Sequence, residues 1–377
     1  MAHARIGIIG AGGAVGGAVA RALLATYPDE LRLGGRRPTA IRDAIGGGID
    51  SGQIVHVDID DEASLAAFCR GCRVVVNCAG PSSRVLDRVA RVAFEAGAAY
   101  VDPAGDDTLF ELLTREPRAS STQTAVVSAG LLPGLSGLVP RWLARRGFER
   151  VRRLTAFACI RDRLTLAAAA DYLHSLSGSY GESLAVWRHR RVSRALAPMI
   201  AVELPFFPGA WNAYPFLTTE IERTAAALNL DEACWYNVFK DDRVVRLIGR
   251  LRGATVDGTQ LMSASAELAD ALNLELFGTT PIQIFVYRLE GVREGKPAER
   301  WAVFEGSDTY ELTGVVAAAA AALIVEGRIG PGVQYAALAL DPDAAIETLR
   351  ACRATATLMD LADVDVERVT GVEDGVL

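Results

Sequence analysis

A glycine cluster close to the N-terminus constrains the fold of this chain more than any other feature. An apolar, β-branched run, Arg5–Ile9, ends directly before it, and an Ala/Leu-rich stretch, Ala18–Thr26, follows it. This is the order of a strand, a tight turn and a helix, in which the backbone and the helix N-terminus can approach a pyrophosphate. The spacing Gly10-x-x-Gly13-x-x-Gly16 departs from the usual fingerprint but stands in the context that the fingerprint requires. It predicts a dinucleotide-binding turn.

Length and composition limit the classes of protein that this chain can belong to. Its 377 residues are enough for two domains with ordinary cores, and 50% of them are hydrophobic. A net charge of −7 argues against a nucleic-acid or anionic-membrane partner. Glycines stand where a signal peptide would need its apolar core, and the longest apolar stretch, 314–325, is too short to span a bilayer. We therefore expect a cytoplasmic protein.

The first third of the chain alternates between short apolar runs and helical stretches. Several of these runs end in Gly, Asp or Asn. The expected strands are residues 31–35, 53–58, 73–77, 99–102 and 124–128, and the expected helices between them include 63–68 and 84–96. Alternation of this kind predicts an α/β fold with a doubly wound parallel sheet, in which the carboxyl ends of the strands line the ligand crevice.

Two arginines at the end of the second expected strand bear on cofactor choice. An NAD-preferring site places an acidic residue there to accept hydrogen bonds from the ribose, whereas Arg36 and Arg37 occupy the place here. A guanidinium fork matches a 2′-phosphate. The alternative is a solvated basic pair, which is common in a chain with 39 Lys and Arg residues. We predict NADP(H), with Arg36 as the principal contact.

Two segments at later strand ends carry a family resemblance. Asn77-Cys78-Ala79-Gly80-Pro81 and Ala99–Asp106, in this order after the glycine turn, resemble the saccharopine dehydrogenase-like family. The resemblance implies a Rossmann domain interrupted by an α+β domain that shapes the substrate pocket, NADP-dependent chemistry, and a homodimer. Together with the patterns above, it gives as cofactor-binding residues Gly10, Gly12, Gly13, Ala14, Val15, Arg36, Arg37, Asp58, Asn77, Cys78, Ala79, Gly80, Pro81, Asp102 and Gly105.

The same resemblance sets the expected domain boundaries. The nucleotide domain would comprise residues 1–130 and 310–352, the inserted substrate and dimerisation domain 131–309, and a C-terminal tail 353–377. Inside the insert, the patterns predict strands at 151–160, 281–288 and 300–304, helices at 164–176, 182–190, 219–228 and 261–276, and an aromatic loop over 205–216. Antiparallel strands with helices on one face suit a domain that closes over a cofactor.

Candidate proton donors are few. Tyr180 stands on a glycine-flanked turn, 177–181, where a substrate could approach the backbone, and a phenol is protonated at neutral pH. His174, on the helix before this turn, is the second candidate. The alternatives are a half-buried core tyrosine and a surface histidine. We expect no metal site, because the Cys69-x-x-Cys72 pair falls at a helix C-terminus and no second ligand pair accompanies it.

These features together predict a two-domain NADPH-dependent oxidoreductase. Reduction of an imine C=N bond fits a site with few titratable groups, because a protonated imine already accepts hydride well and one acid suffices. The imine could be free, or part of a thiazoline-type ring on a carrier-bound substrate. Two alternatives stay open: an enoyl reductase acting on a C=C bond, and a non-catalytic NADP-binding redox sensor.

Overall fold

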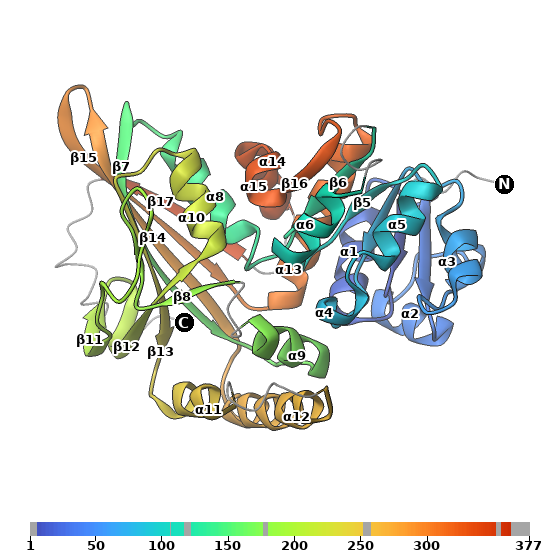
Figure 1. Ribbon diagram of the computed structural model, residues 1–377, viewed down its shortest axis with the longest axis horizontal. Coiled ribbons are helices and arrows are strands. Elements are labelled where there is room, and N and C mark those ends of the chain that lie inside the picture. Colours follow the sequence, from blue (N-terminus) through green and yellow to red (C-terminus); the bar gives the residue numbers. More distant parts are fainter. Residues whose placement is uncertain are drawn as a thin grey trace. The chain divides into compact units, whose positions relative to one another are not determined.

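The computed structural model describes residues 6–105, 107–116, 122–175, 180–251, 258–351 and 356–362 (Figure 1). The chain divides into two compact units. The first consists of Met1–Leu138 with Thr309–Ala354, and the second of Val139–Asp308 with Thr355–Leu377. Among the residues that the structure describes, no helix is long and apolar enough to cross a membrane.

The first unit is built on a seven-stranded sheet in which every pair of neighbours is parallel. Its strands, in sheet order, are β16 (Gly332–Tyr335), β6 (Thr124–Val127), β5 (Ala99–Val101), β4 (Val74–Asn77), β1 (Ile6–Ile9), β2 (Leu31–Gly35) and β3 (Ile54–His56). The order reverses direction between β1 and β4, which is the switch point where such sheets bind ligands. The predicted doubly wound parallel sheet is confirmed.

Helices cover both faces of this sheet. They are α1 (Ala14–Leu24), α2 (Pro38–Ile45), α3 (Glu62–Cys69), α4 (Ser82–Val85), α5 (Arg88–Glu95), α6 (Asp107–Thr114), α13 (Thr309–Val325), α14 (Ala336–Ala339) and α15 (Pro342–Ala351). The single helix expected over 84–96 is wrong at its start. Leu86 has a positive φ of 49°, outside the helical region, so the segment forms two helices, α4 and α5.

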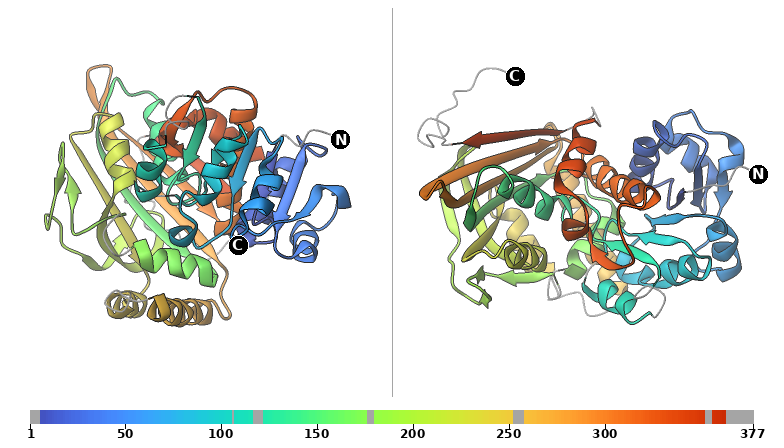
Figure 2. Two further views of the ribbon diagram at one scale, coloured as in Figure 1. Left: turned by 45° about the vertical axis from the view of Figure 1, so that its right-hand side comes forward. Right: turned by 90° about the horizontal axis from the view of Figure 1, so that it is seen from above.

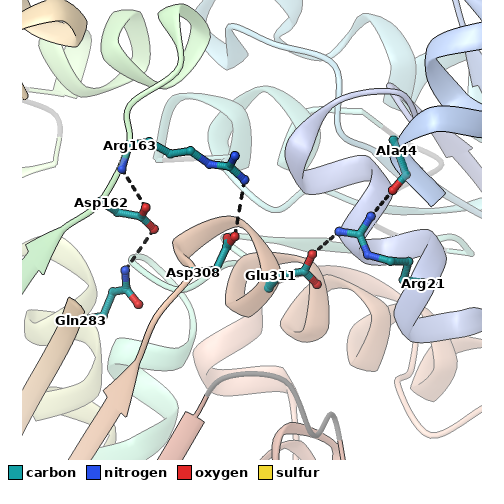
Figure 3. Close-up of polar contacts among 7 residues, drawn as sticks. All are labelled: Arg21, Ala44, Asp162, Arg163, Gln283, Asp308 and Glu311. Atoms are coloured by element: carbon teal, nitrogen blue, oxygen red, sulfur yellow. Dashed lines mark hydrogen bonds and ion pairs between the residues drawn. The ribbon is translucent and has the colours of Figure 1, made fainter. Parts of the chain in front are cut away.

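The returning segment after residue 308 belongs to this unit, because β16 pairs with β6 and α13 packs on α1. A Cβ at Gly314 of α13 would lie 2.4 Å from the Cβ of Ala18 on α1, so the two helices approach each other at a point where only glycine fits. Arg21 of α1 donates hydrogen bonds to Glu311 of α13 and to the Ala44 carbonyl of α2 (Figure 3). One arginine thus joins three helices.

The second unit is built on a ten-stranded mixed sheet. Its main path runs β10 (Arg191–Val192), β9 (Val186–Trp187), β13 (Glu232–Phe239), β7 (Arg150–Arg161), β14 (Ile282–Arg293), β15 (Lys296–Gly306), β17 (Ala356–Ala362). Off this path lie β8 (Gly181–Ser183), β11 (Met199–Leu204) and β12 (Phe207–Thr218). Only β7 and β13 pair in parallel, and the other pairs are antiparallel.

Five helices accompany this sheet: α8 (Leu135–Ala144), α9 (Leu166–Ser175), α10 (Thr219–Ala227), α11 (Arg243–Leu251) and α12 (Gly258–Glu275). Helices α9, α11 and α12 share a small core of their own, which includes Leu173, Leu251 and Leu268 (Figure 1). The larger core lies on the face of the sheet that carries Phe157, Ile284 and Val303.

Three expectations for this unit are wrong, and in each case the segment pairs with a strand that is distant in the sequence. The helix expected at 182–190 is replaced by β8 and β9, since Leu184 and His189 have positive φ angles and β8 pairs with β12. The aromatic loop expected at 205–216 is mostly β12, whose Phe207, Trp211 and Ala213 are buried in the larger core. Residues 356–362, assigned to a tail, form β17 beside β15 (Figure 2).

Candidate functional site

The glycine turn after β1 has a geometry that side chains would disrupt. Gly10 has a positive φ of 78°, and a Cβ there would lie 2.6 Å from the Cys78 carbonyl carbon and oxygen. A Cβ at Gly16 would lie 2.2 Å from the Gly10 carbonyl oxygen. The Gly13 N–H donates to the same oxygen at 2.9 Å and closes the turn. Glycine is therefore required where the turn meets the next strand end and where the helix packs on the turn.

The N-terminus of α1 is open to an anion. Gly13 is its N-cap and provides no side-chain acceptor, and its first turn, beginning with Ala14 and Val15, holds no acidic residue. The first N–H groups of a helix have no partner within the helix, and the helix dipole favours negative charge there. A Cβ at Gly12 would lie 3.2 Å from the Ala40 backbone, a tight contact that α2 would have to relieve by a small shift. The residues fit a dinucleotide phosphate.

Arg36 and Arg37 directly follow the carboxyl end of β2, and both are exposed. Within the described part of the chain, neither guanidinium forms a hydrogen bond or ion pair with the protein. At the end of β3, Asp58 accepts a hydrogen bond from the Asp60 N–H at 3.0 Å, so one of its oxygens shapes a local turn. The arginine pair therefore keeps its donors available for an anionic ligand.

A buried polar network lies where β4 and β5 end. The Asp102 carboxylate accepts hydrogen bonds from the Tyr100 hydroxyl at 2.6 Å and from Asn77 Nδ2 at 3.1 Å. Its other oxygen accepts from the N–H groups of Ala104 and Gly105, at 2.9 and 3.0 Å. Asn77, Tyr100 and Asp102 are all buried. Four donors thus hold one carboxylate, which makes Asp102 an organiser of the loop that follows β5.

Asn77 organises the neighbouring loop in the same way. Its Oδ1 accepts a hydrogen bond from the Ala79 N–H at 3.2 Å, at the start of the predicted Cys78–Pro81 loop. Gly105 is buried, and a Cβ there would lie 2.9 Å from Leu109 of α6. Asn77, Asp102 and Gly105 are predicted cofactor-binding residues. In the structure the Asn77 side chain holds the loop after β4, and the Asp102 side chain holds the loop after β5 through the N–H groups of Ala104 and Gly105.

Burial dominates the electrostatics of this network. It raises the pKa of Asp102 above that of an ordinary aspartate, while the hydrogen bonds from Tyr100 and Asn77 oppose the rise. Burial, together with the charge of Asp102, raises the pKa of Tyr100 well above its usual value, and it raises the pKa of the Cys78 thiol. Tyr100 was missed as a site residue. A tyrosine two positions before an aspartate at a strand end was the available signal.

The two predicted proton donors lie in the second unit. His174 is half-buried in the last turn of α9. Tyr180 is half-buried directly before β8, and its carbonyl accepts a hydrogen bond from the Thr219 N–H at 3.0 Å. Residues 177–179 of the predicted turn lie outside the described residues. The expectation that Gly181 leaves open space is wrong, because a Cβ there would lie 2.3 Å from the Leu217 carbonyl oxygen across the β8–β12 pairing.

The cysteine pair stands where the sequence placed it, at the end of α3. Both thiols are buried, and burial raises the pKa of Cys69 to about 12. A thiol with such a pKa is unreactive. No group of three or more His, Cys, Asp or Glu side chains in the described ranges could hold a metal ion.

Comparison with known families agrees with this geometry. Residues 6–128 match the family model described as "Saccharopine dehydrogenase NADP binding domain". This segment is therefore an NADP-binding domain of the saccharopine dehydrogenase-like family, and the resemblance predicted from the sequence is confirmed. The match also confirms that the cofactor class is a nicotinamide dinucleotide.

Solved structures extend the likeness to the whole fold. Apo saccharopine dehydrogenase (L-Glu forming) from Saccharomyces cerevisiae aligns over 95% of this chain and 100% of its own, with a TM-score of 0.65 and 14% identity. DAP dehydrogenase from C. glutamicum, in complex with DAP, aligns over 93% and 99%, with a TM-score of 0.47 and 15% identity. No curated protein sequence matches the chain. At these identities the yeast structure shows a common fold.

Proposed function

We propose that this protein is an NADPH-dependent oxidoreductase that reduces an imine C=N bond, in a free substrate or in a thiazoline-type ring on a carrier-bound one. The observation that carries the cofactor part is the pair Arg36 and Arg37, exposed at the end of β2 beside a helix N-terminus that offers uncapped N–H groups. Guanidinium donors suit a 2′-phosphate, and the α1 N-terminus suits the pyrophosphate.

Substitution of Arg36 tests this part. Arg36→Ala removes charge-assisted hydrogen bonds to the 2′-phosphate, so it should weaken NADPH binding by about 1.5–3 kcal/mol. NADH lacks that phosphate, and its affinity should stay nearly unchanged. Titration calorimetry with both cofactors measures the difference. Arg42→Ala, which removes another exposed arginine from α2, is the matched control. An equal loss for NADPH and NADH would mean that Arg36 supports the fold, and the preference for NADP would be wrong.

The reaction part rests on the family of the nucleotide domain and on the scarcity of candidate acids. The yeast protein that shares the fold is named for saccharopine and for forming L-Glu. We take as the acceptor the imine that forms when an amine condenses with an aldehyde or ketone. A nicotinamide supplies hydride when bound. This chain's own residues then bind and orient the acceptor and deliver one proton, for which we propose Tyr180, with His174 as the second candidate.

A substrate panel distinguishes the reaction classes. NADPH oxidation at 340 nm is followed with 1-pyrroline as a cyclic imine, a 2-thiazoline, and crotonyl thioester as an enoyl acceptor. We expect turnover with the imines and none with the enoyl compound. Turnover with crotonyl thioester alone would make the protein an enoyl reductase. NADPH binding without turnover of any acceptor would favour the redox sensor.

A further inference from the structure

A short hairpin in the second unit concentrates arginines. Strands β9 and β10 form it, with Trp187 and Arg191 in register. Residues 184–202 hold four arginines, at positions 188, 190, 191 and 194, and contain no Asp or Glu, although the chain as a whole has a net charge of −7. The hairpin is therefore a local concentration of positive charge on an acidic chain.

Two of these arginines are paired with acidic residues of neighbouring elements. Arg188 Nε donates a hydrogen bond to Glu232 of β13 at 2.7 Å. Arg191 donates two hydrogen bonds to Glu222 of α10, at 2.7 and 2.6 Å, and its guanidinium lies 3.7 Å from the carboxylate of Glu182 on β8. Three carboxylates thus face these two arginines. The contacts hold the hairpin against β13, α10 and β8.

The other two arginines keep their charge for a partner. Arg190, in the turn, and Arg194, after β10, are exposed, and neither guanidinium forms a hydrogen bond or ion pair within the described part of the chain. The backbone around them is fixed, because the Arg188 N–H donates to the Arg190 carbonyl at 2.8 Å and the Ala195 N–H donates to the Leu184 carbonyl at 2.8 Å. Both guanidinium groups therefore extend from a fixed backbone.

The charges of the surrounding elements do not cancel this surplus. On β7, Arg153 pairs in register with Glu232, and Arg150 forms an ion pair with Asp231 at 2.8 Å. The Arg152 carbonyl accepts a hydrogen bond from the Asp231 N–H at 2.8 Å. Eight arginines and five acidic residues occur in the segments that these contacts bring together, which are 150–153, 181–195, 219–223 and 231–232. The region is positive even when every acidic residue in it is counted.

The hairpin also contacts the two elements that hold the predicted proton donor. Tyr180 directly precedes β8, and its carbonyl accepts a hydrogen bond from the N–H of Thr219, the first residue of α10. Arg191 binds Glu182 of β8 and Glu222 of α10, so it joins both of these elements to the hairpin. A partner docked on the hairpin would lie next to the segment that carries Tyr180.

The shape and charge of this surface favour a protein partner. Small molecules bind in concave sites, whereas Arg190 belongs to an exposed turn. A nucleic acid is disfavoured by the net charge of −7, because its phosphates would be repelled over the rest of the surface. Exposed charges of one sign guide a protein whose surface carries the opposite sign. An acidic protein surface is therefore the matching partner.

We propose that Arg190 and Arg194 form the docking surface for an acidic carrier protein, which delivers the acceptor on a flexible arm. This inference deepens the proposed function, because it selects the carrier-bound acceptor over the free one, and it rests on that function for the identity of the partner. Binding of a carrier protein can nevertheless be measured without turnover.

A fluorescently labelled holo acyl carrier protein, which is acidic and bears a phosphopantetheine arm, is the probe. Fluorescence anisotropy measures its binding to the full-length protein. We expect the dissociation constant to rise at least about tenfold in the double variant Arg190→Glu/Arg194→Glu, because like charges then face each other. Arg190→Ala/Arg194→Ala should give a smaller rise. Increasing salt from about 50 to 200 mM should weaken binding of the wild type more than that of the Glu variant.

Arg293→Glu/Lys296→Glu is the matched control. Both residues are exposed at the turn between β14 and β15, so this variant makes the same change in net charge at another hairpin of the same unit. It should bind the carrier within about twofold of the wild type. Tryptophan fluorescence on urea unfolding shows whether each variant is folded.

Three results would overturn the proposal: no binding by the wild type, unchanged binding by Arg190→Glu/Arg194→Glu, or an equal loss in the control. Wild-type protein that binds phosphatidylglycerol vesicles and not the carrier would also overturn it and make the hairpin a membrane contact. Turnover of a free imine without carrier binding would overturn this inference alone. Carrier binding without turnover of any acceptor would overturn the proposed function alone.

Discussion

In the unit with the parallel sheet, the buried Asp102 carboxylate receives four donors from the protein itself. In the unit with the mixed sheet, the buried Gln283 amide keeps one oxygen that has no donor among the described residues. The first arrangement holds two loops in one shape, and the second leaves a polar atom for something else to satisfy. The difference is that the polar groups of the first network satisfy one another, whereas the Gln283 amide keeps an acceptor without a donor in the described part of the chain.

The two units also depend on different parts of the sequence for their shape. Glycines with close backbone neighbours, such as Gly10 and Gly16, fix the turn in the first unit. The second unit depends on long paired strands, because β14 pairs with β7 and β15 along nearly its whole length. Local turn chemistry therefore governs one unit and strand register governs the other.

The largest effect that would test this comparison is expected for Gly10→Ala. A Cβ at a positive φ and 2.6 Å from the Cys78 backbone should lower the free energy of unfolding of the first unit by about 3 kcal/mol. All five tryptophans, at positions 142, 187, 211, 235 and 301, lie in the second unit. Thermal unfolding by far-UV circular dichroism should therefore shift downward while the tryptophan fluorescence transition moves less. Equal shifts of both signals would show that the units unfold together.

A smaller effect is expected for Tyr100→Phe, which removes the donor at 2.6 Å from Asp102. Loss of a hydrogen bond to a charged group should cost about 1.5–3 kcal/mol at pH 7. Tyr335→Phe is the control: its hydroxyl bonds to Asp107 at a half-buried position, so it should lose less. Urea unfolding at several pH values measures both variants.

The pH dependence of Tyr100→Phe has a defined sign. Burial raises the folded-state pKa of Asp102, so its contribution to stability is present below the unfolded pKa of about 3.9 and is lost as pH rises through the folded pKa. The Tyr100 hydrogen bond opposes that rise in pKa, so in the variant the folded-state pKa is higher still and the loss of stability continues to a higher pH. The gap between wild type and variant should therefore grow as pH rises through the folded-state pKa of the wild type. A gap that is constant with pH would mean that Asp102 does not titrate in this range.

An effect of comparable or smaller size is expected in the second unit for Tyr180→Phe. If Tyr180 is the proton donor, imine reduction should slow at least tenfold, or about 1.4 kcal/mol, with NADPH affinity unchanged. Steady-state turnover and cofactor titration separate these quantities. Unchanged turnover in this variant together with a loss in His174→Ala would assign the proton to His174. Unchanged turnover in both would mean that the proton comes from water or from the substrate.

The smallest effect is expected for Gly249→Ala, the counterpart of Gly10→Ala in the second unit. Gly249 lies within α11, and a Cβ there would meet no atom within 4 Å. Alanine should stabilise the helix by about 0.5–1 kcal/mol, because glycine loses more backbone freedom on folding. The tryptophan fluorescence midpoint should rise slightly. A fall would mean that Gly249 has a role beyond the helix, and that glycine also matters structurally in this unit.

Much of the first unit could be predicted from the sequence, because its signals are local. The strand–glycine–helix order at Gly10–Gly16, the arginines after β2 and the polar residues at the ends of β4 and β5 are all short segments whose chemistry depends on near neighbours. The errors in the second unit concern segments whose partners are distant. The segment around Trp211 contains prolines typical of a loop, yet it becomes a strand because β13 and the larger core lie beside it.

The sequence by itself determined the fold of the nucleotide domain, the class of cofactor and the arginine pair expected to select NADP, since each follows from residue types within a few positions of one another. Only the tertiary structure decided that Asn77 and Tyr100 both donate hydrogen bonds to the Asp102 carboxylate. It also decided that Gln283 is buried beside Asp162 with an amide oxygen that has no donor among the described residues. Residues 162 and 283 are far apart in the chain, and their meeting depends on the antiparallel register of β7 and β14. Strand register and burial are properties of the packed sheet, so no local pattern around Gln283 could have revealed them.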